Sequence, residues 1–271
     1  MGQMLIEGGK VEENLNRAEE MIRKAAANDC QVIVLPECLD AGWTHPSARE
    51  IAEEIPGETS DRLCEAARDN NVMVIAGLTE RDGEKIYNSA VLIDENGRIL
   101  LKHRKINVLK IAQDLYSIGN MLSVAETNLG TIGVNICADN FISSLAIGHV
   151  LARMGAHFIF SPSAWAVKAD HDNSKDPYGE TWLRAYRSLC RLYEISIVGV
   201  SNVGWITDGP WKGRKVIGCS LAVDPKGEVL AKGPYGSDAE ALIIVNLQAQ
   251  PREIKGTDYA AYLKEKGYVG P

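Results

Sequence analysis

The chain has 271 residues, enough to bury a substantial core, and its 45% apolar and 24% charged composition is ordinary for a globular protein. Its 29 Lys and Arg against 36 Asp and Glu give a net charge of −7, which argues against nucleic acid or an anionic membrane surface as the main partner. No run approaches the roughly 18 apolar residues of a membrane span, and no basic-then-apolar leader precedes Gln3. The six cysteines are scattered without a CxxC pair, so we expect a reduced, cytoplasmic protein with free thiols.

Strand and helix patterns alternate early and β-rich pairs follow, which predicts one α/β domain over residues 1–249. Amphipathic spacing predicts helices at 12–28, 59–70 and 180–194. Apolar, mostly β-branched runs predict strands at 31–35, 72–78, 131–136, 157–161, 195–202 and 241–247, the first of them central in its sheet. Turn residues predict hairpins at 88–102, 121–136 and 216–232. The polar tail 250–271 is expected to pack on a partner subunit or to be loosely held.

Cys137 directly follows the predicted strand 131–136, and helix-like apolar spacing from Phe141 to Met154 comes after it. A cysteine at a sharp strand-to-helix junction has the placement of a nucleophile elbow, with sulfur in place of the usual serine oxygen. The partial positive charge of a helix N-terminus would favour the thiolate. The alternative is that Cys137 is a small buried hydrophobe, the commonest fate of a free cysteine.

Glu37 and Lys105 also follow hydrophobic strands, and chemistry gathers at strand ends because the loops there are free of ladder constraints. The three residue types are complementary: a cysteine attacks a carbonyl or nitrile carbon, and a carboxylate moves the protons. A lysine stabilises the oxyanion, helped by a backbone N–H such as that of Ala138. The alternatives are a solvated turn carboxylate for Glu37 and one more surface cation, in the basic run 102–105, for Lys105.

Three motifs occur in order: Leu35-Pro36-Glu37, His103-Arg104-Lys105-Ile106 and Asn135-Ile136-Cys137-Ala138-Asp139. Together they resemble the three signatures of the nitrilase superfamily, the carbon–nitrogen hydrolases, and the likeness extends over roughly residues 3–247. The resemblance implies a four-layer α-β-β-α sandwich that pairs with a second subunit as αββα-αββα, in a homodimer or higher homo-oligomer. It also implies that neither a cofactor nor a metal is required.

The resemblance assigns a role to each of the three side chains. Glu37 would be the general base, Lys105 the oxyanion donor and Cys137 the nucleophile. The substrate would be a small amide, ureido compound or nitrile, cleaved through a thioester with release of ammonia or an amine. Because true nitrilases favour Cys-Trp-Glu over the Cys137-Ala138-Asp139 found here, the sequence favours amides or ureido acids.

The family usually carries a second glutamate in the loop after the lysine. Asp114 takes that place best, with Gln113 as the runner-up, and a solvated surface acid is the alternative for Asp114. Trp165, after the strand 157–161, and Tyr116, close to Asp114, are further candidates for substrate binding.

Asp170-His171-Asp172 could suggest metal ligands, but three neighbours in an extended segment rarely converge on one ion, so a solvated rim loop is favoured. Three rivals to an amidase stay open at this point. They are a nitrilase, an acyltransferase that passes the acyl group to an amine, and a non-catalytic binding protein on the same fold.

Overall fold

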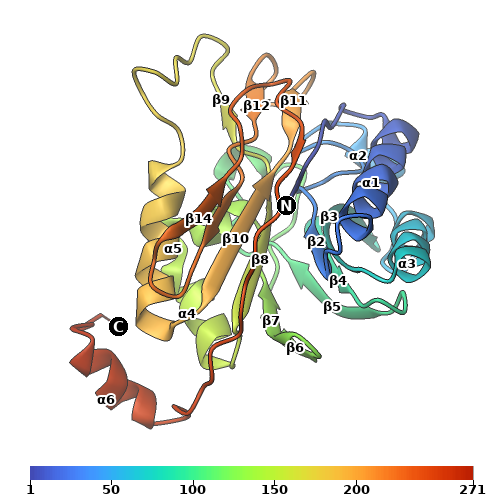
Figure 1. Cartoon of the computed structure of the whole chain (residues 1–271). Helices are drawn as coiled ribbons and strands as arrows, with labels where there is room; N and C mark the ends of the chain where they lie inside the picture. The colour runs from blue at the N-terminus through green and yellow to red at the C-terminus, as the bar shows by residue number, and fades with distance from the viewer. Residues whose placement is uncertain (271) are drawn as a thin grey trace.

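Two β-sheets lie face to face with helices on their outer faces in the computed structural model, which describes residues 1–270 (Figure 1). Helices α1 (Val11–Ala26) and α3 (Glu58–Asn70) cover one sheet. Helices α4 (Leu145–Arg153) and α5 (Glu180–Tyr193) cover the other. This is the predicted α-β-β-α sandwich, while the pairing of two such sandwiches stays a prediction.

The first sheet has the order β2-β3-β4-β5, with bounds β2 (Val32–Val34), β3 (Met73–Asp82), β4 (Lys85–Ile93) and β5 (Ile99–Arg104). The predicted hairpin at 88–102 is its β4–β5 pair. Strand β2 pairs only with β3 and is therefore an edge strand, so the central position expected for 31–35 was wrong. The run is apolar because it is buried on both faces: Ile33 packs under α1, and Val34 packs between the sheets.

The second sheet has the order β14-β13-β10-β8-β7-β6. Its strands are β6 (Val124–Thr127), β7 (Gly130–Val134), β8 (Phe158–Ser163), β10 (Ser196–Ser201), β13 (Leu221–Val223) and β14 (Val229–Lys232). Strand β8 runs parallel to both β7 and β10. The residues that follow β7, β8 and β10 therefore come together at one edge of the sheet, as loops after parallel strands do.

Shorter elements complete the fold. Strand β1 (Gly2–Gln3) pairs with β15 (Ala241–Leu242), and β12 (Lys215–Ile217) pairs with both β9 (Ala166–Val167) and β11 (Val203–Trp205). The remaining helical turns are α2 (Ala48–Ile51), η1 (Lys110–Ala112), η2 (Cys137–Asn140) and η3 (Ile142–Ser144). No helix in residues 1–270 is long and apolar enough to cross a membrane.

The structure corrects three predicted boundaries. The helix expected from Phe141 begins only at Leu145, after two short 3-10 turns. The third hairpin consists of β13 and β14 alone, because residues 215–217 turn away to pair with β9 and β11. The strand expected at 241–247 is regular only over Ala241–Leu242, where β1 supplies a partner.

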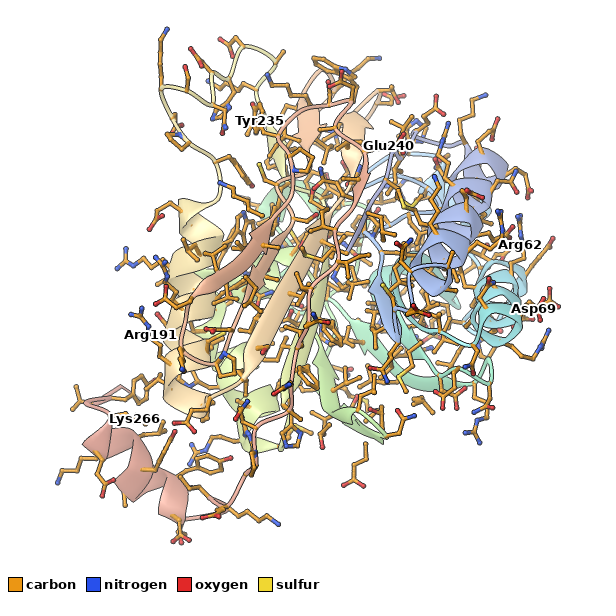
Figure 2. The ribbon with its side chains drawn as sticks, viewed as in Figure 1. Arg62, Asp69, Arg191, Tyr235, Glu240 and Lys266 are labelled. Carbon is orange, nitrogen blue, oxygen red and sulfur yellow. The ribbon has the colours of Figure 1, made fainter. Side chains whose placement is uncertain are left out.

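The tail folds back on its own chain near the ends of α4 and α5. It contains α6 (Asp258–Glu265), which buries Tyr259 and Leu263. Before that helix, the Arg252 guanidinium donates to the carbonyl oxygens of Ala152 and Tyr193. After it, Lys266 Nζ lies 2.9 Å from Glu194 Oε1 (Figure 2). Packing of this tail on a partner subunit stays a prediction.

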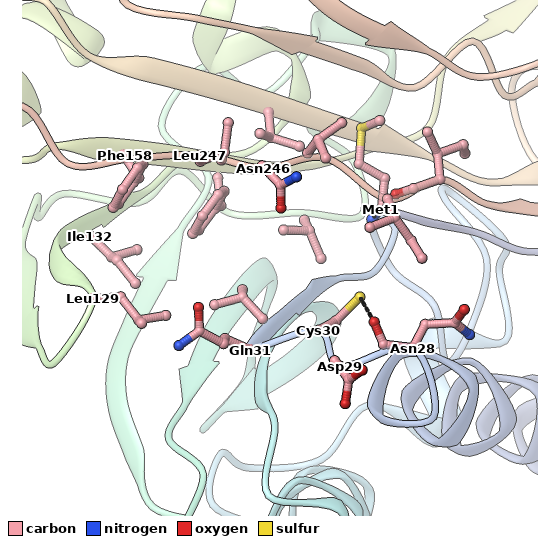
Figure 3. A pocket seen from close by; sticks show the side chains of 17 residues that line it. Met1, Asn28, Asp29, Cys30, Gln31, Leu129, Ile132, Phe158, Asn246 and Leu247 are labelled. Atoms are coloured by element: carbon pink, nitrogen blue, oxygen red, sulfur yellow. Dashed lines mark hydrogen bonds between the residues drawn. The ribbon is translucent and has the colours of Figure 1, made fainter.

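A cavity of about 350 Å³ opens between the two sheets near the N-terminus (Figure 3). Its walls include Met1 and Leu247 as well as Ile132 and Phe158 of the second sheet. Cys30 also lines it, with its Sγ 3.9 Å from the Asn28 carbonyl oxygen. None of the three predicted reactive side chains lines this cavity. These three side chains gather instead at the edge where β7 and β8 end.

Candidate active site

Glu37 lies in the turn that follows β2, and its side chain is buried. The next residue, Cys38, has a φ of 46°, so the chain turns sharply directly after the carboxylate. Gly77 of β3 lies against this turn, where an added Cβ would come within 2.6 Å of Glu37 Cα. The sheet can hold the Glu37 turn this closely only because the facing residue has no side chain.

Lys105 follows β5, at the end of a basic run whose side chains alternate between two faces, as they do on any strand. On the outer face, Lys102 and Arg104 both bond to the buried carboxylate of Glu80. On the inner face, His103 and Lys105 are buried, and Lys105 is only 2% exposed. Lys105 is therefore not a surface cation.

The Glu37 carboxylate is held by one of its two oxygens. Lys105 Nζ lies 2.6 Å from Oε1, and Asn88 Nδ2 donates to the same oxygen at 2.6 Å. The other oxygen, Oε2, is buried and accepts no hydrogen bond from any residue in 1–270. A buried oxygen without a donor is uncommon and calls for a chemical reason. Oε2 is free to accept a proton from a neighbouring group.

Cys137 occupies the sharp turn after β7, with a φ of 45°. Its backbone N–H donates to Ser161 Oγ at 3.1 Å. Asn140 Nδ2 donates to the same hydroxyl oxygen at 2.8 Å and exchanges side-chain hydrogen bonds with Asn135. A left-handed conformation costs energy for a residue with a Cβ, and it persists only where its surroundings fix it. The sequence places Cys137 at a nucleophile elbow, and the structure has that sharp turn.

The Cys137 thiol is held in its neutral form. Burial and the neighbouring charge of Glu37 raise its pKa to about 12, while the charge of Lys105 acts in the opposite direction. The expectation that a helix N-terminus favours the thiolate was wrong, because the turn at Cys137 is a four-residue 3-10 helix and α4 begins only at Leu145. A neutral thiol needs a base before it can act as a nucleophile.

Lys105 is held in its charged form. Burial alone would lower the pKa of its ammonium group, but the charge of Glu37 and the hydrogen bond to its carboxylate outweigh burial and raise it. The site therefore combines a protonated lysine, a protonated thiol and a carboxylate with one free oxygen.

A cavity of about 440 Å³ lies beside these groups, with Lys105, Cys137 and Ala138 among its lining residues. Trp165, expected as a binding residue, also lines it and stacks on Trp182 with 5.0 Å between ring centroids. Other aromatic side chains complete the wall: Trp43, Phe141, Tyr178 and Trp211. A small organic molecule could therefore reach the Cys137 sulfur.

Asp139 is a buried residue to which the sequence pattern assigns no role. Its Oδ1 accepts hydrogen bonds from the backbone N–H groups of Ile106 and Asn107, directly after Lys105. Its Oδ2 accepts from the N–H of Ile136, directly before Cys137. One carboxylate thus joins the two segments that carry the lysine and the cysteine.

The structure does not bring Asp114 or Tyr116 to the cavity. The Asp114 side chain is exposed, and only its carbonyl oxygen is engaged, by the Arg49 guanidinium at 2.8 Å. The runner-up, Gln113, is also exposed. Tyr116 is buried behind the Glu37 turn, where its hydroxyl accepts from the Thr44 N–H at 3.2 Å and lies 3.6 Å from Cys38 Sγ. Tyr116 thus supports the turn rather than the substrate cavity.

The segment 170–172 forms part of the cavity rim. His171 lines the cavity and shares a hydrogen bond of 2.8 Å with the Tyr235 hydroxyl (Figure 2). Asp172 points elsewhere and accepts from Ser174. No group of three or more His, Cys, Asp or Glu side chains is arranged to hold a metal ion in the part of the chain that the structure describes.

Comparison with known proteins decides the family. The family model described as carbon-nitrogen hydrolase matches residues 1–255. The chain belongs to the carbon–nitrogen hydrolase family. An omega-amidase from Danio rerio is 32% identical over 248 residues, covering 88% of this chain and 83% of that protein. A nitrilase from Pyrococcus abyssi is 32% identical over 225 residues, covering 81% of this chain and 78% of that protein.

Solved structures of other carbon–nitrogen hydrolases show the same fold. One from Helicobacter pylori G27 superposes with a TM-score of 0.79 at 21% identity, covering 89% of this chain and 85% of that chain. An amidase of the nitrilase superfamily from Nesterenkonia AN1 gives a TM-score of 0.78 at 19% identity, covering 97% and 92%. The nitrilase-superfamily fold that the three motifs predicted is thereby confirmed.

Proposed function

We propose that this carbon–nitrogen hydrolase cleaves a small linear amide or N-carbamoyl compound through a thioester on Cys137. The observation that carries the proposal is the state of Glu37. Its Oε1 is occupied by Lys105 and Asn88, while its Oε2 is buried, without a donor in residues 1–270, and close to a thiol that burial and the Glu37 charge together keep protonated. This arrangement suits a general base, because Oε2 has room to accept the thiol proton.

In the first half of the reaction, Glu37 Oε2 takes the proton from the thiol and the Cys137 sulfur attacks the substrate carbonyl carbon. The oxygen becomes an oxyanion, which the Lys105 ammonium and the Ala138 N–H stabilise. Glu37 then returns the proton to the leaving nitrogen, the carbon–nitrogen bond breaks, and ammonia or an amine departs. The acyl group stays on sulfur as a thioester.

In the second half, a water molecule loses a proton to Glu37 and attacks the thioester carbonyl carbon. The carbon–sulfur bond breaks, the acid is released, and the sulfur takes back the proton from Glu37. Asp114 receives no step, because its side chain is exposed and does not line the cavity.

Two findings support an amide over a nitrile. The sequence after the nucleophile is Ala138-Asp139 rather than tryptophan–glutamate, and several curated relatives at 27–32% identity are omega-amidases. In a glutamate-to-glutamine mutant of the Nesterenkonia amidase the acetamide moiety of fluoroacetamide is added covalently at the active-site cysteine, which supports a nucleophilic thiol in this fold. The Pyrococcus relative keeps a nitrilase as the second candidate.

The test is an ammonia-release assay over short aliphatic amides, ω-amides of dicarboxylic acids, N-carbamoyl amines and the matching nitriles, with Cys137→Ala as the control. We expect turnover of amides or carbamoyl compounds that Cys137→Ala lacks, and an acyl adduct on Cys137 by intact mass. Equal ammonia release with and without the sulfur would end the enzyme proposal. Turnover of nitriles alone would establish the second candidate, and faster capture of the acyl group by hydroxylamine than by water would establish an acyltransferase.

A further inference from the structure

The walls of the cavity beside Cys137 are aromatic over much of their extent. The Trp43 and Trp211 rings lie 4.9 Å apart, and Phe141 stacks on Trp182 at 5.1 Å. Aromatic faces carry negative electrostatic potential and attract cations within about 6 Å of the ring centre. The wall therefore favours a neutral or positively charged substrate over an anionic one.

The charged residues that line the cavity also favour a neutral or positively charged substrate. Lys105 is the one lysine or arginine among the lining residues of the described chain, and its ammonium is already paired with Glu37 at 2.6 Å. Two carboxylates, Asp176 and Glu180, line the outer part of the cavity, where both residues are exposed. Asp176 Oδ2 lies 3.5 Å from His171 Nε2, and no salt bridge engages Glu180 within residues 1–270.

Three other cations contact residues of the cavity wall without lining the cavity themselves. Lys215 Nζ donates to the His171 carbonyl oxygen at 3.1 Å, and Lys232 Nζ donates to the Tyr178 carbonyl oxygen at 2.9 Å. The Arg214 guanidinium lies over the Trp211 ring at 4.0 Å. None of these three residues lines the cavity. A substrate carboxylate entering the cavity would lose water without gaining a cationic partner, which is unfavourable.

We infer that the substrate ends in an ammonium group at the end remote from the scissile bond, and that Asp176 and Glu180 recognise that group at the mouth of the cavity. This inference rests on the proposed function and names the substrate class of the same site. An amide of equal length that ends in a carboxylate is then a poor substrate, and one that ends in a methyl group is intermediate.

The test compares three amides that each have a five-carbon chain but differ in the charge of the terminal group: 5-aminopentanamide, pentanamide and glutaramate. The readout is kcat/KM for ammonia release at low ionic strength. We expect 5-aminopentanamide to exceed glutaramate by about tenfold or more, because the aromatic wall and both carboxylates act in the same direction. Added salt should reduce the ratio, since the carboxylates are exposed and screened.

The double variant Asp176→Asn, Glu180→Gln tests the assigned residues. For this variant, kcat/KM for 5-aminopentanamide divided by kcat/KM for pentanamide should fall several-fold. Because both side chains are exposed, the variant should fold normally. Asp172→Asn is the matched control, because Asp172 lies in the same segment, bonds to Ser174 and does not line the cavity. It should leave the ratio unchanged.

The outcomes separate this inference from the proposed function. Turnover of pentanamide with glutaramate equal to or better than 5-aminopentanamide overturns the inference alone. An unchanged ratio in the double variant likewise overturns the roles of Asp176 and Glu180. Failure of all three amides, together with the amides and carbamoyl compounds of the wider panel, overturns the proposed function itself.

Discussion

His103 and Asp139 form a buried pair, with 2.9 Å between His103 Nε2 and Asp139 Oδ2. His103 lies two residues before Lys105, and Asp139 lies two residues after Cys137. Burial would raise the pKa of Asp139, but its hydrogen bonds with His103 and with the N–H of Asn107 lower it instead. Asp139 is therefore an anion that fixes the distance between the lysine and the cysteine.

The first prediction concerns Asp139→Asn. Both oxygens of the Asp139 carboxylate accept hydrogen bonds from backbone N–H groups, whereas an asparagine side chain has only one acceptor oxygen. The NH₂ group of the asparagine would therefore face a backbone N–H, and the Lys105 segment should shift. We expect kcat to fall by about 100-fold with a smaller change in KM, because small misplacements of reacting groups have effects of that size. Steady-state kinetics and circular dichroism on the folded variant measure this.

Glu80→Gln is the matched control, because Glu80 is a buried carboxylate that bonds to the outer face of the same strand. It should lower the thermal midpoint and leave kcat per folded molecule close to that of the wild type. An Asp139→Asn variant with full kcat would show that Asp139 does not position the reacting groups.

The second prediction concerns the ionisation of Cys137. Since its raised pKa is about 12, the thiol should show no thiolate absorbance near 240 nm at pH 7–9, measured against Cys137→Ala. The charge of Glu37 is one cause of the raised pKa and Lys105 opposes it, so Glu37→Gln should lower the pKa of Cys137. The thiolate should thus appear at lower pH in a variant that has lost turnover. A higher thiol pKa in Glu37→Gln would contradict the role of the carboxylate.

The third prediction concerns the ion pair of Lys105 and Glu37. Lys105→Met leaves the Glu37 carboxylate buried without its cation, which should lower the free energy of unfolding by about 3–5 kcal/mol. The double variant Lys105→Met, Glu37→Gln removes both charges and should recover part of that loss. Urea unfolding measures both, and neither variant should turn over substrate. Equal stability losses in the single and double variants would mean that the buried charge is not what costs stability.

The sequence predicted Glu37, Lys105 and Cys137 as the reactive residues from the three motifs and from their places after apolar strands, and their catalytic roles stay a prediction. The layers were predicted from the resemblance that the three motifs carry, while hydrophobic periodicities of 3.6 and 2 predicted the helices and strands themselves. The edge position of β2 was missed because burial on both faces makes an edge strand look like a central one.

The partners of the basic run 102–105 could not be predicted in the same way. Alternation on a strand divides the four basic side chains between two faces, and each face then needs buried acids. Glu80 is the acid on the outer face, and Glu37 and Asp139 are the acids on the inner face. The pattern shows that acids are required, but which acids meet the strand depends on contacts between segments far apart in the chain. Asp114 was a candidate because the resembled family carries a second glutamate in the loop after the lysine, and a place in that loop does not determine exposure.

The fourth prediction concerns Gly77, which lies against the Glu37 turn in β3. An added Cβ would lie 2.6 Å from Glu37 Cα and 2.8 Å from the Pro36 carbonyl oxygen, and both are backbone atoms that cannot rotate away. Gly77 also donates to Pro36 O at 3.0 Å and accepts from the Leu39 N–H at 2.8 Å, so its own backbone is tied to the turn. Gly77→Ala should therefore move the Glu37 turn as a whole, at a cost of about 1–3 kcal/mol.

In the proposed mechanism Glu37 must reach both the thiol and Lys105, so this shift should lower kcat by at least tenfold at a temperature where the variant is folded. Gly83→Ala is the control. Gly83 has a φ of 58° and no atom within 4 Å of an added Cβ, so alanine there strains the β3–β4 turn by about 1–2 kcal/mol without touching the site. Both variants should unfold at lower urea concentration, and only Gly77→Ala should lose activity. Equal kcat in the two variants would show that the closeness of β3 to the Glu37 turn contributes to stability alone.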